Sequence, residues 1–75
     1  MQVGCGLRVR RIAGGDYVYF WHYEREAGRS RRLEAYVGPV RDPRTRREGG
    51  AKVLAYCRRV QADLASKIAR LERGE

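Results

Sequence analysis

The chain has 75 residues, with 17 Lys and Arg against 9 Asp and Glu, and a net charge of +8. We expect a single domain over residues 1–75, too small for a deep catalytic cleft. The positive charge favours a polyanionic partner, with nucleic acid preferred over a membrane surface. We find no secretory signal and no apolar run of membrane-spanning length, so we expect no membrane partner and a cytoplasmic location.

The cysteine, asparagine and glutamine content narrows the class of protein further. Cys5 and Cys57 are too few for a disulfide framework, and the one histidine gives little material for a metal site, so we predict neither metal nor cofactor. The chain has no Asn and only two Gln among many Arg and Glu, a composition typical of thermophile proteins. In such a protein a Cys5–Cys57 disulfide is one alternative, although two buried thiols are the favoured interpretation.

The aromatic stretch 17–23, Tyr-Val-Tyr-Phe-Trp-His-Tyr, dominates the chain. Aromatic and β-branched residues favour a strand, which we place at about 17–25. Because side chains alternate along a strand, one face carries the tyrosines and Trp21, and the other carries Val18, Phe20 and His22.

Two further strands flank the aromatic one. Residues 1–6 read as a lead-in, and alternation over about 7–13 predicts a first strand. Gly14-Gly15 then suits a two-residue hairpin turn, which would place Val9 opposite Phe20 and Arg8 opposite Trp21. A second turn over 26–30 leads to a third strand at about 31–37, where an even-length loop would place Phe20 beside Ala35 or Val37.

A helix should follow. Asp42-Pro43 is typical of an N-cap with Pro at the first helical position, but Gly49-Gly50 interrupts the pattern, so the helix begins near 43 or near 51 and ends near 73. An apolar stripe then recurs at spacings of three and four, formed by Val53, Cys57, Val60, Leu64, Ile68 and Leu71. The predicted fold is α+β: a three-stranded antiparallel β-meander with one C-terminal amphipathic α-helix packed on one face, in the order β-β-β-α.

The helix stripe should cover the aliphatic sheet face formed by Leu7, Val9, Val18, Phe20, Leu33, Ala35 and Val37. That leaves a bare face of aromatic rings and arginines, a combination suited to stacking on bases and contacting phosphates. We therefore predict a non-enzymatic nucleic-acid-binding protein, with DNA favoured over RNA and a chromosome-associated location. The candidate binding residues are Arg8, Arg10, Tyr17, Tyr19, Trp21, Tyr23, Arg32 and Tyr36 on the sheet, with Arg44, Arg46 and Arg47 in the strand-to-helix connection.

Two alternatives remain open from the sequence. The aromatic face could be a protein-interaction or homodimer surface, or the helix could cover the aromatics and leave Val18 and Phe20 outside.

Residues 17–40, with their aromatic strand, glycine turn, basic residues and Tyr36-Val37-Gly38, resemble segments of archaeal transposase- and recombinase-associated proteins. They are also similar to the three-stranded-sheet DNA-binding domains at the N-termini of some tyrosine recombinases. The resemblance implies a sheet laid on DNA through Arg8, Arg10, Tyr19, Trp21, Arg32 and Tyr36. It implies no catalytic activity, because the chain has no room for the recombinase catalytic domain.

Overall fold

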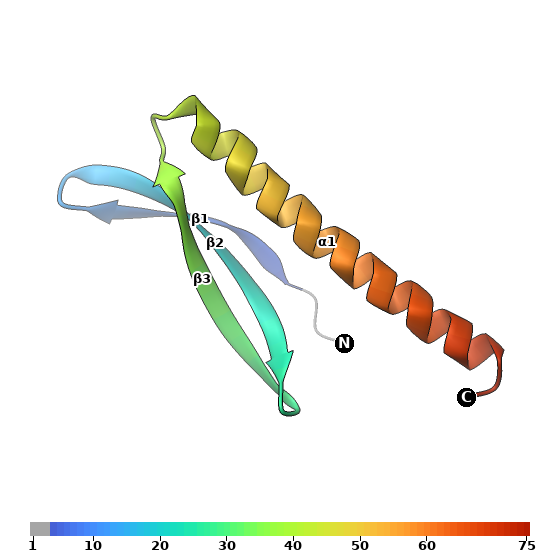
Figure 1. Ribbon diagram of the computed structural model, residues 1–75. Helices are drawn as coiled ribbons and strands as arrows, with labels where there is room; N and C mark the ends of the chain where they lie inside the picture. Colours follow the sequence, from blue (N-terminus) through green and yellow to red (C-terminus); the bar gives the residue numbers. More distant parts are fainter. Residues whose placement is uncertain (1–3) are drawn as a thin grey trace.

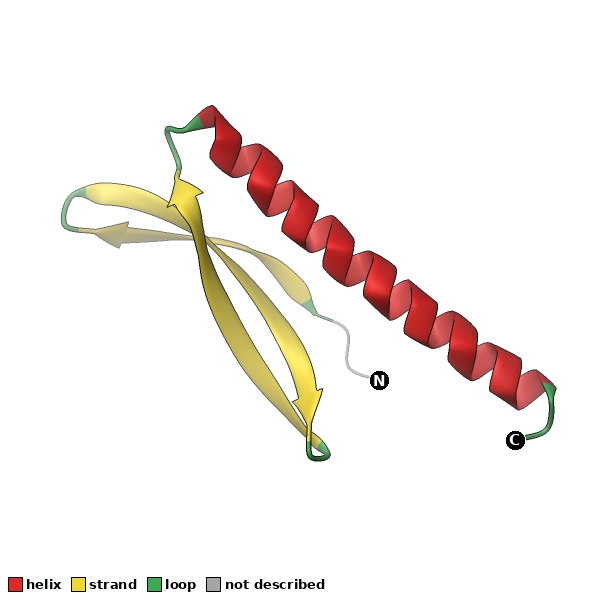
Figure 2. Ribbon diagram, in the orientation of Figure 1, coloured by secondary structure: helices red, strands yellow, loops and turns green. Residues whose placement is uncertain are grey.

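A computed structural model describes residues 4–75 and contains three strands followed by one helix (Figures 1 and 2). The elements are β1 (Cys5–Ile12), β2 (Gly15–Glu26), β3 (Arg29–Pro39) and α1 (Pro43–Glu72). The strands form one antiparallel sheet in the order β1-β2-β3. The predicted β-β-β-α fold is confirmed. The first three residues of the expected lead-in, and of the expected domain 1–75, lie outside the described part.

Both hairpin turns have two residues, as expected for the first, whereas the second is tighter than the turn expected over 26–30. The turns are the dipeptides Ala13-Gly14 and Ala27-Gly28, all four residues having positive φ, which matches the right-handed twist of the flanking strands. The expected turn at Gly14-Gly15 is wrong by one residue. Gly15 belongs to β2, because a Cβ there would lie 2.8 Å from the Tyr17 hydroxyl.

The turn position sets the register of β1. Leu7 pairs with Phe20 and Arg8 with Tyr19, so the expected pairing of Arg8 with Trp21 is wrong by two residues. Because side chains alternate with a period of two, a two-residue shift leaves every side chain on its predicted face. The expected pairing of Phe20 with Ala35 is confirmed in the second hairpin.

A bulge adjusts the end of β3. Tyr19 pairs with Tyr36 but Val18 pairs with Gly38, so Val37 is an extra residue on β3. Val37 and Gly38 are both buried, and a Cβ on Gly38 would lie 2.4 Å from the Thr45 hydroxyl oxygen. Only glycine therefore allows α1 to approach the sheet this closely at its first turn.

The helix begins at Pro43, which decides between the two predicted starts. Asp42 is its N-cap, and its carboxylate accepts a hydrogen bond from the Arg44 backbone N–H at 2.9 Å. Gly49 and Gly50 lie inside α1. Gly49 is buried because Leu7 packs over it, 3.0 Å from where its Cβ would be.

The core lies between the sheet and the first half of α1. Phe20, Val37 and Tyr56 are buried, and partly buried Cys5, Val18, Val53 and Val60 pack around them. The helix therefore packs on the aliphatic face, as predicted, but leaves Leu7 and Val9 of that face 44% and 58% exposed. The alternative with the aromatics beneath the helix is wrong. No side chain among residues 4–75 is fully buried, so the core is thin.

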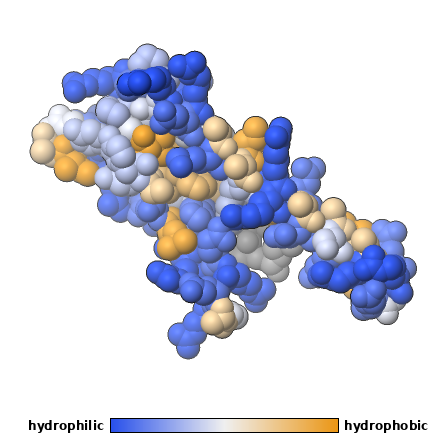
Figure 3. All heavy atoms as spheres, viewed as in Figure 1, coloured by the Kyte–Doolittle hydropathy of each residue, from blue (hydrophilic) through white to orange (hydrophobic). Residues whose placement is uncertain are grey.

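The second half of α1 extends past the sheet, and the two diverge from their shared end (Figure 1). Leu64, Ile68 and Leu71, expected to face the sheet, are 48%, 47% and 61% exposed. The radius of gyration is 15.8 Å, against about 11 Å for a compact chain of this length. Apolar residues reach the surface at several places between charged ones (Figure 3).

Residues 4–75 contain no helix that is both long and apolar enough to cross a bilayer.

The two adjacent helix glycines provide a matched pair for testing the packing. Gly50→Ala should raise the free energy of unfolding by about 0.5–1 kcal/mol, because alanine favours the helix and a Cβ there meets nothing within 4 Å. Gly49→Ala should gain less, because the Leu7 side chain must move aside. Urea denaturation of both variants checks this, and equal gains would show that Leu7 does not pack on Gly49.

The helix cap predicts a dependence on pH. Hydrogen bonds from the Arg44 side chain and backbone N–H lower the pKa of Asp42 below its ordinary value of 3.8. A lowered folded-state pKa gives stability that is present above the ordinary value and lost as pH falls through the folded one. Asp42→Ala should therefore lower the melting temperature at neutral pH, and the difference from wild type should narrow in acid. Asp63→Ala, which removes a carboxylate outside the cap, should show no such narrowing.

Candidate nucleic-acid interface

The sheet face opposite α1 carries side chains from all three strands in rows. Arg8, Tyr19 and Tyr36 form one row across the sheet. The next row contains Gly6, Trp21 and Glu34, so Arg8, the expected partner of Trp21, belongs one row away. Every predicted sheet residue of the site lies on this face, and no described element covers it (Figures 1 and 2).

Glycines on β1 make room for the largest rings. A Cβ on Gly6 would lie 2.9 Å from the Trp21 ring, and one on Gly4 would lie 3.1 Å from the Tyr23 ring. The backbone N–H of Tyr23 also donates to the Gly4 carbonyl at 3.1 Å. The rings therefore lean over the β1 backbone and are half-buried rather than standing free in solvent.

The rings contact one another in two groups. Tyr36 packs against Tyr19 and Tyr17, with centroids 5.6 and 6.1 Å apart. Trp21 meets Tyr23 edge to face at 6.1 Å. Such pairs fix ring orientation, and each is worth about 0.5–1.5 kcal/mol beyond the burial of area. Tyr36 is 54% exposed and offers the most open ring of the face.

Three arginines lie among these rings and differ in the contacts that their guanidinium groups make. The guanidinium of Arg10 is 5.0 Å from the Tyr19 ring centroid and pairs with Glu34 at 2.8 Å. That of Arg32 is 5.2 Å from the Trp21 ring. Arg8 forms no side-chain hydrogen bond or ion pair with any residue from 4 to 75. Glu34 thus neutralises one of the three cations and leaves a net positive face.

The arginines of the predicted connection lie elsewhere. Arg44, Arg46 and Arg47 belong to the first turns of α1, on the other side of the sheet, and Arg44 pairs with Asp42 at 3.0 Å. A flat surface resting on the aromatic face cannot touch them at the same time. They belong to the helix and not to the predicted strand-to-helix connection, because the helix begins at Pro43.

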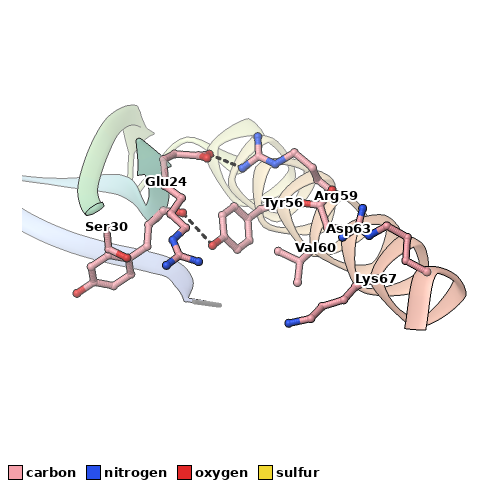
Figure 4. A pocket seen from close by; sticks show the side chains of 10 residues that line it. Glu24, Ser30, Tyr56, Arg59, Val60, Asp63 and Lys67 are labelled. Carbon is pink, nitrogen blue, oxygen red and sulfur yellow. Dashed lines mark hydrogen bonds and ion pairs between the residues drawn. The ribbon is translucent and has the colours of Figure 1, made fainter. Parts of the chain in front are cut away.

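A second basic surface was not predicted. A cleft of about 520 Å³ separates the end of the β2–β3 hairpin from the second half of α1 (Figure 4). Arg25, Arg59, Lys67 and Arg70 line it, together with Glu24 and Asp63. The charged residues that α1 contributes recur every three or four positions, which places them on one face of the helix: Arg59, Asp63, Lys67 and Arg70.

The wall of this cleft holds the helix to the sheet. The Tyr56 hydroxyl donates to the Tyr23 carbonyl at 3.0 Å and accepts from the Gly4 N–H at 3.4 Å. Arg59 pairs with Glu24, whose carboxylate lies 3.1 Å from His22 Nδ1. His22 is stacked on Phe20 with centroids 4.9 Å apart. The Tyr56 hydroxyl and the Arg59–Glu24 ion pair therefore tie the helix to the sheet, whereas His22 Nδ1 is buried without a hydrogen-bond partner among the described residues.

The two cysteines approach each other from β1 and α1, and both are free thiols. The expectation of two buried thiols is wrong, because Cys5 is only partly buried and Cys57 is exposed at the surface of α1. Burial, followed by the neighbouring Cys57 thiol, raises the pKa of Cys5 above its ordinary value. A raised pKa leaves less thiolate, the reactive form, so Cys5 is a poor nucleophile.

Within residues 4–75, no group of three or more His, Cys, Asp or Glu side chains is placed to hold a metal ion. No protein-family model, curated protein or solved structure matches this chain.

Proposed function

We propose that the protein binds nucleic acid, with DNA favoured over RNA, by laying the aromatic face of its sheet on the ligand. The observation that carries this proposal is a sheet face with five aromatic rings and three arginines that no described element covers. A small domain does not normally leave so many rings together at the surface without a binding use. The protein would act without catalysis, in the cytoplasm and in association with the chromosome.

On this proposal the members of the face have different roles, which their contacts support. Arg8 lacks a described ion-pair partner and can meet a phosphate without first releasing one, whereas Arg10 must exchange Glu34 for it. Tyr36 and Trp21 offer surfaces to bases or sugars, because ring faces accept any base. The chain's net charge of +8 adds long-range attraction and makes binding sensitive to salt.

The two faces of β1 allow a matched charge test. Arg8→Ala should weaken binding to duplex and single-stranded DNA and should reduce the dependence of log K on log salt concentration by about one phosphate contact. Arg11→Ala removes the same charge from the same strand but on the opposite face, where Arg11 lies near Asp16. It should leave that dependence unchanged. Fluorescence anisotropy with labelled oligonucleotides at several salt concentrations measures both.

Two outcomes would count against this face. Equal losses for Arg8→Ala and Arg11→Ala would mean that net charge alone drives binding. A larger loss for Lys67→Ala than for Arg8→Ala would move the interface to the cleft beside α1. If no oligonucleotide binds even at low salt, the proposal fails and the protein-interaction alternative gains.

Trp21→Ala should weaken DNA binding about 10- to 100-fold, because stacking on a base is worth about 1–3 kcal/mol. Its ring packs on Gly6, Tyr23 and Arg32 outside the main core, so the fold should persist by far-UV circular dichroism. Trp21→Phe is the matched control and should retain most of the affinity. A folded Trp21→Ala variant that binds like wild type would remove Trp21 from the site.

A further inference from the structure

The chain exposes more surface than its mass requires. Its accessible surface is 5908 Å², whereas a compact monomer of 8.7 kDa exposes about 4,700 Å². The excess is on the order of 1,200 Å², more than the roughly 800 Å² that each partner buries in a standard protein interface. The folded chain therefore has enough spare surface for a stable partner.

Much of the exposed apolar surface lies along one line of α1. Leu54, Leu64, Ile68 and Leu71 are each 47–61% exposed. Together with exposed Cys57 and Gln61 they occupy positions 54, 57, 61, 64, 68 and 71, spaced alternately by three and four residues. This is the repeat of a two-stranded coiled-coil seam.

Beyond Cys57, whose thiol neighbours Cys5 of β1, the seam is separate from the stripe that holds α1 to the sheet. The sheet-facing residues are Gly49, Val53, Tyr56 and Val60, about a quarter of a turn away around the helix. From the sequence the two stripes merge into one, because Val53, Val60 and Leu64 all fit a single broad apolar face. The structure divides them, since the β2–β3 hairpin diverges from the second half of the helix and leaves a cleft between the two (Figures 1 and 4).

We propose that a second copy of this chain packs its own α1 against this seam, forming a two-fold dimer centred on Leu64, Ile68 and Leu71. Every position of the seam is uncharged, so two chains of charge +8 can meet there without bringing like charges into the interface. A partner of unrelated sequence is less well matched, because a heptad seam is best complemented by another heptad seam.

The flanking charges indicate a parallel alignment. Lys67 precedes Ile68 and Glu72 follows Leu71, which are the flanking positions that face each other across a parallel pair. Lys67 of one copy would then lie beside Glu72 of the other. Gln61 would meet Gln61 of the second copy, and a polar pair within an apolar seam fixes the register of the two helices.

This inference does not rest on nucleic-acid binding, because the seam and the aromatic face lie on different elements. A dimer would present two aromatic faces and double the number of phosphate contacts, but its formation needs no ligand. If the chain fails to bind DNA, the dimer proposal is unaffected. If the chain is a monomer, the proposal of DNA binding is unaffected.

Sedimentation equilibrium of the full chain without DNA provides the test. Wild type should show twice the 8.7 kDa chain mass at micromolar concentrations. Leu64→Lys with Ile68→Lys should give a monomer, because burying two lysine pairs in the seam is unfavourable. Ala62→Lys with Ala69→Lys is the control: it adds the same charge to the same turns, away from the seam, and should remain a dimer.

Two results would overturn the proposal. One is a wild-type monomer at all concentrations, and the other is a dimer that survives the Leu64 and Ile68 changes. If Tyr36→Ala then dissociates that surviving dimer, the interface lies on the aromatic face. Lysine is a good helix former, so none of these substitutions should unfold α1. Trp21 fluorescence reports independently whether the sheet remains folded in each variant.

Discussion

A single helix can cover only one face of a three-stranded sheet, and this constraint shapes the whole molecule. β2 places aliphatic and aromatic side chains on opposite faces, and α1 packs on the aliphatic one around Phe20. The rings must then remain at the surface and are stabilised by one another, by the glycines of β1 and by arginines lying over them. The same packing choice that forms the core also creates the candidate interface.

The attachment of the helix depends on a few close contacts. Gly38 lets Thr45 approach the sheet at one end, Gly49 receives Leu7 in the middle, and Tyr56 hydrogen-bonds to the backbone of β2. Beyond Val60 these contacts stop, although the helix continues to Glu72. An isolated helical extension is marginal in water, so the exposed turns need either intrinsic helix propensity or a partner.

The molecule therefore has two kinds of surface available for binding. The sheet face combines rings with positive charge, which suits an anionic ligand with flat bases. The helix seam is apolar and uncharged, which suits another apolar helix. Because the two surfaces lie on different elements, one can be occupied without blocking the other. The basic cleft between the β2–β3 hairpin and α1 is lined by residues of both the sheet and the helix.

The sequence by itself determined which residues share a face, because alternation along Tyr17–Tyr23 survives any even change of register. It also determined the helix cap, since Asp42 and Pro43 act through neighbouring backbone groups. Only the tertiary structure decided the turn at Ala13-Gly14, because the Tyr17 ring needs the space above Gly15. It alone separated Leu64, Ile68 and Leu71 from the core and placed Arg25 and Lys67 around one cleft. Those outcomes depend on how the β2–β3 hairpin and the helix diverge from their shared end, which local sequence patterns do not encode.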